Sequence, residues 1–349
     1  MRKNIKRVFI AGGTGFLGYY AGLEFLSRGI AVSTIALPNE IDVSGWFPKE
    51  ISLAYGNLFE MTYEELIALF SNQEYDAIIY ALGPDERFVP QGKAYPFFYE
   101  KLVTNAKRIL SAAKSSGINR AVVLNSYFSY FDRVYKGQLS KKHPYIHARV
   151  EQEKELATLG TDGTFDVMFL ELPYIFGTMP QRTPLWKDYF LKYFDRSKVI
   201  FFPFGGGTTA VDVKDVARAI MAATINGEND GKYQIGEMNI SYRNMLKIMM
   251  DAKGTPKPFI GVLPILAAMG AAKLDAKMKK EGKESGLDHY WLMLQIQNHK
   301  FFIDSNKYKK ELRYDELGII SAENVVDSIQ KTIIRCYEEP KKGQGPNKS

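Results

Sequence analysis

Short apolar segments alternate with longer amphipathic segments over the first part of the chain. The apolar segments predict β-strands at residues 7–11, 31–36, 51–55, 76–81, 121–125 and 166–172. The amphipathic segments predict helices at residues 16–28, 63–70, 95–116 and 145–159. Such alternation is typical of a parallel sheet that helices cover on both faces. Because crossover connections are right-handed, we expect an α/β fold with a doubly wound sheet and a ligand crevice at the carboxyl ends of its strands.

The pattern changes after Gly177. A proline-containing loop, an aromatic helix, a strand, a glycine turn and a further helix are predicted, in this order, at residues 179–184, 186–194, 199–202, 205–207 and 213–224. From residue 255 the chain is mostly helical in pattern and basic. We therefore expect a smaller, mostly helical substrate-binding lobe at residues 178–337, interleaved with the sheet, and a disordered tail at residues 338–349.

A glycine-rich segment directly follows the first predicted strand. Glycines stand at positions 12, 15 and 18, and an amphipathic helix begins near Phe16. This spacing allows a sharp turn, close approach of the backbone to a pyrophosphate and tight packing of helix on strand. The helix N-terminus also presents unpaired N–H groups and the positive end of its dipole. The segment predicts a dinucleotide site in a Rossmann domain of residues 1–177, to which segments near residues 199–235 return.

The composition is typical of a globular protein. Of the 349 residues, 46% are hydrophobic and 24% are charged, as in an ordinary globular protein. The single cysteine, Cys336, excludes an intrachain disulfide, and we interpret it as a small apolar residue of the last helix. No segment has the pattern of a signal peptide or a transmembrane span, so we expect a cytoplasmic protein.

The net charge of +7 comes largely from lysine-rich segments at residues 273–283, 307–313 and 341–348. No nucleic-acid-binding module accompanies them, so we expect no nucleic-acid partner and interpret these segments as solvated helix faces and a loose tail. An alternative is an RNA- or membrane-associated protein that uses the basic lobe at residues 273–283.

Candidate catalytic groups lie in two later segments. The strand at 121–125 ends in Asn125-Ser126, at the edge where a doubly wound sheet holds its ligand. Tyr145 and Arg149 are four residues apart at the start of a helix and therefore project from one face. A fixed cation stabilises the phenolate of a neighbouring tyrosine, which lowers its pKa toward a range useful for acid–base catalysis. Alternatively, these two residues form a surface pair with the tyrosine half-buried.

These residues belong to motifs that resemble the extended short-chain dehydrogenase/reductase superfamily, which includes the NAD-dependent epimerase/dehydratase family. The motifs extend over nearly the whole chain and are Gly12-Gly-Thr-Gly-Phe-Leu-Gly18, Gly56-Asn-Leu58, Tyr80-Ala-Leu-Gly83, Asn125-Ser126, Tyr145-x-x-x-Arg149, Leu172-Pro-Tyr-Ile-Phe-Gly177, Val211-Asp-Val-Lys-Asp-Val216, and Asp304-Ser-Asn-Lys307 with Glu311-Leu-Arg-Tyr314.

The resemblance implies a nicotinamide cofactor, NAD or NADP, and a small-molecule substrate with a carbonyl or hydroxyl group. It implies Tyr145 as general acid/base, Ser126 as a hydrogen-bond partner of the substrate oxygen, and Arg149 as the residue that holds the ribose. Arg182 and Lys187 would bind a substrate anion. The implied cofactor-binding residues are Gly12, Gly13, Thr14, Gly15, Phe16, Leu17, Gly18, Asn57, Leu58, Ala81, Leu82, Gly83, Tyr145, Arg149, Pro173 and Ile175. It also implies a homodimer through the helices at residues 95–116 and 145–159.

The chain departs from the family pattern at four places. Arg149 replaces a lysine and cannot give up its proton, which puts a lysine-type proton relay in doubt. The second strand ends in Ile35-Ala-Leu-Pro38, with no carboxylate for the ribose of NAD and no arginine for the phosphate of NADP. Leu102 stands where many members have asparagine, although Asn105 follows one turn later. Tyr174 stands where enzymes that act on UDP-sugars often have asparagine.

Several functional interpretations remain open at this point. An epimerase or dehydratase returns the hydride to the same substrate, whereas a reductase does not, and the family resemblance favours the first group. The alternative class is a non-catalytic, dinucleotide-binding regulatory protein, which Arg149 and the bare end of the second strand support. His143 and His147 have the spacing of metal ligands, but no third ligand accompanies them, and we assign no metal.

Overall fold

The computed structural model describes residues 4–38, 42–195, 197–320 and 322–338. The tail predicted at residues 338–349 lies outside the described residues from residue 339 onward. The other predicted segments can be compared with the structure directly.

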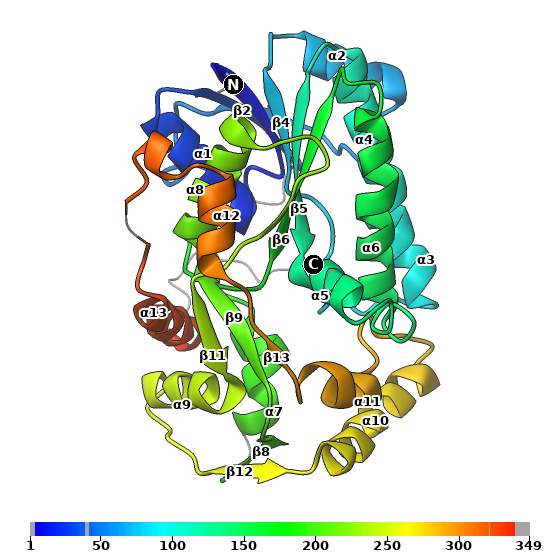
Figure 1. Ribbon diagram of the computed structural model, residues 1–349, viewed down its shortest axis with the longest axis vertical. Coiled ribbons are helices and arrows are strands. Elements are labelled where there is room, and N and C mark those ends of the chain that lie inside the picture. Colours follow the sequence, from blue (N-terminus) through cyan, green and yellow to red (C-terminus); the bar gives the residue numbers. More distant parts are fainter. Residues whose placement is uncertain (1–3, 39–41, 196, 321, 339–349) are drawn as a thin grey trace.

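Seven parallel strands form the main sheet, in the order β10-β6-β5-β4-β1-β2-β3 (Figure 1). The strands are β1 (Arg7–Ala11), β2 (Ala31–Ala36), β3 (Ser52–Tyr55), β4 (Ala77–Tyr80), β5 (Arg120–Ser126), β6 (Asp166–Leu172) and β10 (Lys232–Gln234). All six predicted strands are present, and the doubly wound α/β fold is confirmed. The reversal of strand order between β1 and β4 places a crevice at their carboxyl ends.

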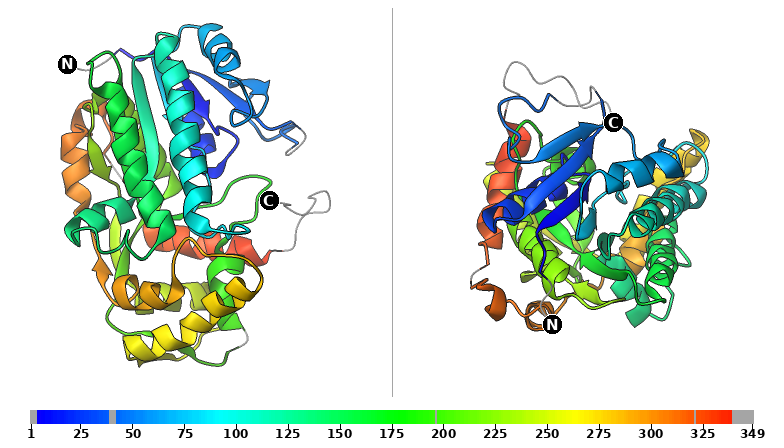
Figure 2. Two further views of the ribbon diagram at one scale, coloured as in Figure 1. Left: turned by 90° about the vertical axis from the view of Figure 1, so that its right-hand side faces the viewer. Right: turned by 90° about the horizontal axis from the view of Figure 1, so that it is seen from above.

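Helices cover both faces of this sheet (Figures 1 and 2). One layer contains α1 (Phe16–Ser27), α8 (Val213–Asn226) and α12 (Ser305–Glu311), and the other contains α2 (Tyr63–Ser71), α4 (Asn105–Ser115) and α6 (Pro144–Ala157). Alternate residues of each strand enter opposite layers: Val8 and Ile10 pack in the first core, whereas Phe9 and Ala11 pack in the second. The strands inside the sheet are buried on both faces, which explains their nearly continuous apolar sequences, whereas the edge strand β3 is partly exposed.

The helix predicted at residues 95–116 is interrupted. It consists of α3 (Ala94–Tyr99), a π-helical turn (Glu100–Thr104) and α4. The carbonyl of Leu102, in the π-helical turn, accepts a hydrogen bond of 2.7 Å from the Gln152 side chain of α6. Leu102 is fully buried and packs against Gly83, so this departure from the family pattern is part of the core.

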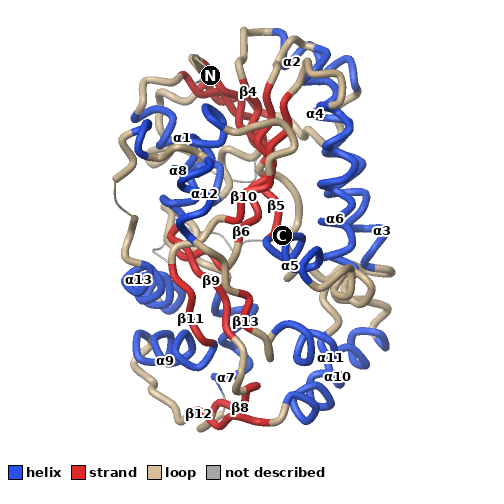
Figure 3. The backbone as a smooth tube through the Cα atoms, viewed as in Figure 1, coloured by secondary structure: helices blue, strands red, loops and turns tan. Residues whose placement is uncertain are grey.

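The second lobe lies beyond the carboxyl edge of the main sheet, and Figure 3 shows its two small sheets. These contain β7 (Tyr174–Phe176), β9 (Gly207–Asp212), β11 (Met238–Ser241) and β13 (Lys300–Phe301) in one sheet, and β8 (Ile200–Pro203) with β12 (Phe259–Val262) in the other. Its helices are α7 (Lys192–Asp195), α9 (Tyr242–Ala252), α10 (Pro264–Lys280), α11 (His289–Trp291) and α13 (Val325–Tyr337).

The two parts of the chain are interleaved in detail. After β6 the chain enters the second lobe, returns through α8 and β10 to the main sheet, and leaves it again at β11. Residues 305–317 return once more, and Tyr308 and Leu312 pack in the same core as α1. Strand β8, by contrast, pairs with β12 in the second lobe.

Two elements of the structure, β9 and α5 (Tyr127–Val134), were not predicted from the sequence. Strand β9 begins at Gly207, the last residue of the predicted glycine turn. The β-branched residues Thr208, Thr209 and Val211 favour an extended strand, and β9 pairs with β7, β11 and β13. Helix α5 was not predicted, since its many aromatic residues have low helix propensity. Tertiary packing stabilises both elements.

The aromatic segment at residues 186–194 belongs to the core of the second lobe. It forms a π-helical turn (Lys187–Leu191) followed by α7. Trp186 stacks on Phe176 with ring centroids 4.5 Å apart. Cys336 of α13 is buried nearby, its thiol donates to the carbonyl of Pro184, and burial raises its pKa to about 11. Among the described residues, no helix is both long and apolar enough to cross a membrane.

Candidate active site

The loop between β1 and α1 has glycine at the positions where its backbone contacts other backbone segments. Gly12 has φ +94°, and a Cβ there would lie 2.7 Å from the carbonyl oxygen of Ala81. A Cβ at Gly18 would lie 2.2 Å from the carbonyl oxygen of Gly12, so only glycine lets α1 pack this close to the loop. The loop is held by Gly13 N–H, which donates to Thr34 Oγ1 at 3.0 Å.

A cavity of about 1020 Å³ begins at this loop and extends into the second lobe. Near the sheet it is lined by Gly15, Phe16, Leu17, Ala81, Leu82, Gly83, Leu124, Asn125, Ser126, Tyr145, Arg149, Pro173, Ile175 and Gly177. Residues predicted from five separate motifs therefore meet at one cavity: four of the motifs lie at strand ends on the same edge of the sheet, and the fifth, with Tyr145 and Arg149, lies on α6.

Tyr145 and Arg149 form the polar centre of this end of the cavity. Arg149 Nε donates to the Tyr145 hydroxyl at 2.9 Å, and Arg149 Nη1 donates to the carbonyl of Leu124 and to the side chain of Gln152 at 3.1 and 2.9 Å. Both side chains are buried, so the alternative of a surface pair is wrong. The guanidinium is a fixed cation whose position is set by β5 and by α6 itself.

The pKa of Tyr145 differs from the prediction. Burial raises it to about 12, and the nearby carboxylates of Glu86 and Asp85 add to this effect, although the charge of Arg149 acts in the opposite direction. The predicted lowering is therefore wrong for this structure, because desolvation outweighs the cation. At neutral pH the hydroxyl is protonated and can donate a hydrogen bond.

Ser126 lies at the junction of β5 and α5. Its side-chain oxygen caps α5 by accepting from Phe128 N–H at 3.3 Å, which leaves its hydroxyl proton able to donate to another oxygen. The neighbouring Asn125 donates through its amide to the carbonyl of Arg149 at 3.1 Å and accepts from Ser129 at 3.2 Å. Asn125 thus fixes the strand end relative to α6.

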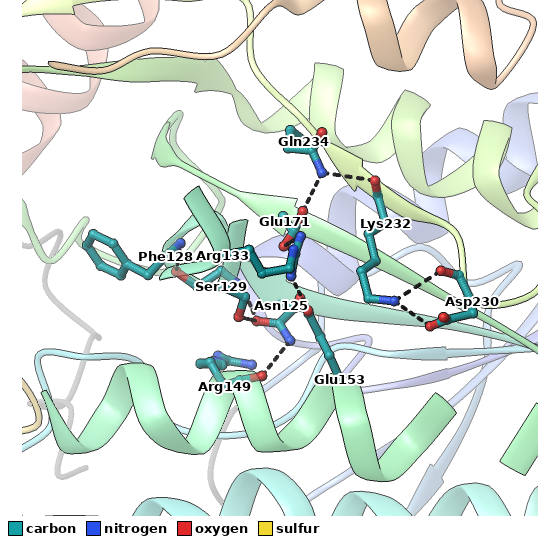
Figure 4. A network of polar contacts seen from close by, with 11 residues as sticks. Asn125, Phe128, Ser129, Arg133, Arg149, Glu153, Glu171, Asp230, Lys232 and Gln234 are labelled. Atoms are coloured by element: carbon teal, nitrogen blue, oxygen red, sulfur yellow. Dashed lines mark hydrogen bonds and ion pairs between the residues drawn. The ribbon is translucent and has the colours of Figure 1, made fainter. Parts of the chain in front are cut away.

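Behind this junction lies a buried charge network, which Figure 4 shows together with Asn125. Glu153 of α6 and Glu171 of β6 are both buried, and Arg133 of α5 bridges them with N–O distances of 2.6 and 2.5 Å. Gln234 of β10 also donates to Glu171. Burial and the neighbouring Glu171 raise the pKa of Glu153 well above its ordinary value. The network holds α6, and with it Tyr145, against the sheet.

A charged cluster missed by the sequence prediction lies in the loop after β4. Asp85, Glu86 and Arg87 line the cavity, and Arg87 forms an ion pair with Asp85. Burial and Asp85 raise the pKa of Glu86, whose carboxylate in turn raises that of Tyr145. The signal that could have found them is a run of three charged residues in the loop that follows a buried strand, at the ligand edge of the sheet.

The remaining predicted residues lie in different places. Arg182 lines the cavity, whereas Lys187 is exposed and lies over the Tyr337 ring, with its Nζ 5.0 Å from the centroid. Asn57 and Leu58 follow the edge strand β3, where Asn57 accepts from Phe59 N–H at 3.0 Å and Leu58 is buried. These two residues are not among the cavity's lining.

The two histidines with metal-ligand spacing do not converge on a site. His143 is fully buried before α6, and burial lowers its pKa to about 3. His147 stacks on Tyr95 with ring centroids 4.3 Å apart. Within the part of the chain that the structure describes, no three potential ligand side chains gather around a common point.

The loop fits the pyrophosphate of a dinucleotide. The backbone of Gly15 is exposed to the cavity at the N-terminus of α1, where N–H groups lack helical partners, and the glycines leave room for phosphates. A model of the NAD dependent epimerase/dehydratase family matches residues 8–236. The chain belongs to this family. Its cofactor is accordingly a nicotinamide dinucleotide, as predicted.

Several solved structures have a similar fold. A nucleoside-diphosphate-sugar epimerase from Pseudomonas aeruginosa is 14% identical, with a TM-score of 0.68 and coverage of 94% of this chain and 96% of that one. The Bordetella bronchiseptica enzyme WbmH, solved with NAD+, is 15% identical, with a TM-score of 0.64 and coverage of 95% and 99%. A UDP-N-acetylglucosamine 4-epimerase from Bacillus cereus is 15% identical, with a TM-score of 0.62 and coverage of 96% and 100%. No curated protein is significantly similar in sequence.

Proposed function

We propose that this epimerase/dehydratase-family protein is an enzyme that uses NAD or NADP to act on a carbonyl or hydroxyl group, as an epimerase, a dehydratase or a reductase. The observation that carries the proposal is the contact of 2.9 Å between Arg149 and the Tyr145 hydroxyl, in the same cavity as Ser126 and the glycine loop. When bound, the nicotinamide supplies hydride acceptance and donation.

The chain's own residues supply the proton chemistry. The protonated Tyr145 hydroxyl donates to a substrate carbonyl oxygen, and in the reverse direction its phenolate accepts a hydroxyl proton. Ser126 donates a hydrogen bond to the same oxygen. Arg149 stabilises the phenolate that forms, and it does so as a permanent charge because it cannot release its proton.

Glu86 is a second candidate for proton transfer. Its raised pKa brings a carboxyl closer to the range in which it can exchange a proton at neutral pH. It faces the same cavity as Tyr145. Dehydration requires a group that removes a proton from the carbon next to the carbonyl, and Glu86 is our candidate for that role, whereas hydride-mediated epimerisation needs only the proton transfer at the substrate oxygen.

Titration of the protein with NADH and with NADPH, followed by nicotinamide fluorescence, tests the proposal first. We expect saturable binding, with one cofactor preferred, and then turnover with a member of a panel of carbonyl compounds and nucleotide sugars. Binding without turnover on any panel member would favour the non-catalytic, dinucleotide-binding alternative. Absence of binding by folded protein would contradict the proposal.

Replacement of Gly18 with alanine is expected to weaken NADH binding at least tenfold, about 1.4 kcal/mol. The added Cβ would lie 2.2 Å from the Gly12 carbonyl oxygen, so the loop must move away from α1. Gly270→Ala is the matched control, since nothing lies within 4 Å of a Cβ at that helical glycine. Unchanged NADH affinity in Gly18→Ala would place the pyrophosphate elsewhere.

We also propose a homodimer through the outer faces of α4 and α6, as in related enzymes. The two helices are joined within one chain by an ion pair of 2.8 Å between Lys107 and Glu155. Light scattering during size exclusion should give twice the chain mass, and a monomer at micromolar concentration would contradict this arrangement.

A further inference from the structure

Most side chains that line the part of the cavity farthest from the glycine loop are apolar, although Lys192, His289 and Gln297 of the second lobe also line the cavity. Helix α10 contributes residues at helical spacing, so that one face of the helix lines the cavity: Leu266, Ala267, Gly270, Ala271, Leu274 and Met278. Phe194, Phe202 and Met293 line it from other elements. A ligand segment that fits here gains from burying hydrocarbon, since each methylene group removed from water raises affinity about fourfold.

The surface around the start of the same helix is exposed and also apolar. Ala268 is the one buried residue among the seventeen of α10. The side chains that form what we call the tip patch are exposed by 58 to 62%: Phe201, Phe204, Leu263, Leu266 and Met269. Phe201 and Leu266 also line the cavity, so the cavity opens within the patch. Large apolar side chains grouped in this way mark an interaction surface.

The second half of α10 carries a strong positive charge. Lys273, Lys277, Lys279 and Lys280 are all exposed, and Asp275 is the helix's one acidic residue, with its carboxylate bound to His289 at 2.6 Å. An exposed apolar segment that continues into a cluster of lysines is complementary to a bilayer with anionic headgroups. This charge argues for a lipid surface as the occupant of the patch, because an identical basic patch on a second copy would be repelled.

We propose that the protein docks the tip patch on an anionic bilayer and takes from it an amphipathic substrate, whose oxygenated end reaches Tyr145 and whose apolar chain lies beneath α10. Placing the oxygenated end at Tyr145 rests on the proposed function, whereas the docking and the position of the apolar chain do not. Arg182 and Lys192 also line the cavity, so a nucleoside diphosphate is the competing ligand that the test must exclude.

The first experiment measures ligand class without turnover. The fluorescent fatty acid cis-parinaric acid is bound to the full chain and displaced with octanol, dodecanol, hexadecanol or uridine diphosphate. We expect affinity to rise with each added methylene and Gly270→Trp to weaken probe binding about tenfold by filling the cavity. The glycine tolerates this change because its Cβ position is open and a side chain favours the helix. Displacement by uridine diphosphate with no dependence on chain length would overturn the lipid assignment.

The second experiment measures docking. We expect co-sedimentation with vesicles of phosphatidylcholine and phosphatidylglycerol, weaker binding to phosphatidylcholine alone, and loss of binding in the double variant Leu263→Ser, Met269→Ser. Neither residue lines the cavity. Ile320→Ser is the matched control, because Ile320 is 96% exposed in a different region. Absence of sedimentation, or a dimer that becomes monomeric in the double variant, would overturn the docking.

These readouts separate the two proposals. NADH titration tests the dinucleotide site alone, and neither the alcohol series nor the vesicles require a bound cofactor. Lipid binding without NADH binding would contradict the proposed function and leave the position of the apolar chain standing. NADH binding with no dependence on alcohol length would do the reverse.

Discussion

Replacement of Tyr145 with phenylalanine is expected to lower the turnover number by about 10²–10⁴-fold while NADH affinity stays within about twofold. The substitution removes only the hydroxyl that Arg149 Nε contacts at 2.9 Å. The ring remains packed against Phe98, with centroids 5.3 Å apart, so the fold is preserved. Because burial keeps the hydroxyl protonated, its loss removes the proton donor for the substrate oxygen. Steady-state oxidation of NADH with the best carbonyl substrate measures the effect.

Tyr127→Phe is the matched control for this prediction. Tyr127 lines the same cavity and is fully buried, but its hydroxyl is hydrogen-bonded to Thr208 at 2.8 Å. We expect its turnover number to remain within a few-fold of wild type. Equal losses in both variants would mean that packing of the aromatic cluster, rather than proton transfer, was disturbed. Full activity in Tyr145→Phe would remove this residue from the catalytic role.

Replacement of Arg133 with methionine is expected to lower the free energy of unfolding by about 3 kcal/mol at pH 8. The guanidinium is 40% exposed, but the carboxylates it bridges, Glu153 and Glu171, are 4% and 0% exposed. Removing it leaves the negative charge of this buried pair of carboxyl groups without its cation, and such a loss typically destabilises strongly. Urea unfolding monitored by circular dichroism measures the change. Lys247→Met, in an exposed pair with Asp251, is expected to cost less than about 1 kcal/mol.

The same network predicts the direction of the pH dependence. The pKa of Glu153 is raised in the folded state, so the folded protein binds a proton that the unfolded chain has already released above its ordinary pKa. The stabilising contribution is complete below that ordinary pKa and is lost as pH rises through the raised value. In Arg133→Met we expect a steeper loss of stability as pH rises above the ordinary pKa of a glutamate, and Glu153→Gln in that background should reduce it. If Arg133→Met lowers the free energy of unfolding equally at every pH, the cause would be lost packing and not an uncompensated charge.

The sequence by itself determined the framework of this protein. Strands such as those that contain Val8, Val122 and Phe169 are buried on both faces, so their apolar character is visible without knowledge of the fold. Neighbouring backbone atoms leave no room for a Cβ at positions 12 and 18, so only glycine fits there. The glycine spacing can therefore be recognised in the sequence. The i and i+4 spacing of Tyr145 and Arg149 likewise fixes a contact within one helix. Local constraints of these kinds leave a pattern in the chain.

Only the tertiary structure decided what depends on contacts between distant segments. The pKa of Tyr145 follows from burial and from Glu86, which lies 59 positions earlier in the chain. Arg133, Glu153 and Glu171 come from three different elements, and no sequence pattern indicates that they contact one another. Strand β9 and the exposed side of α10 were not predicted for the same reason. Burial, desolvation and exposure are properties of the assembled fold, and the charges and apolar side chains that define this site acquire their effect only there.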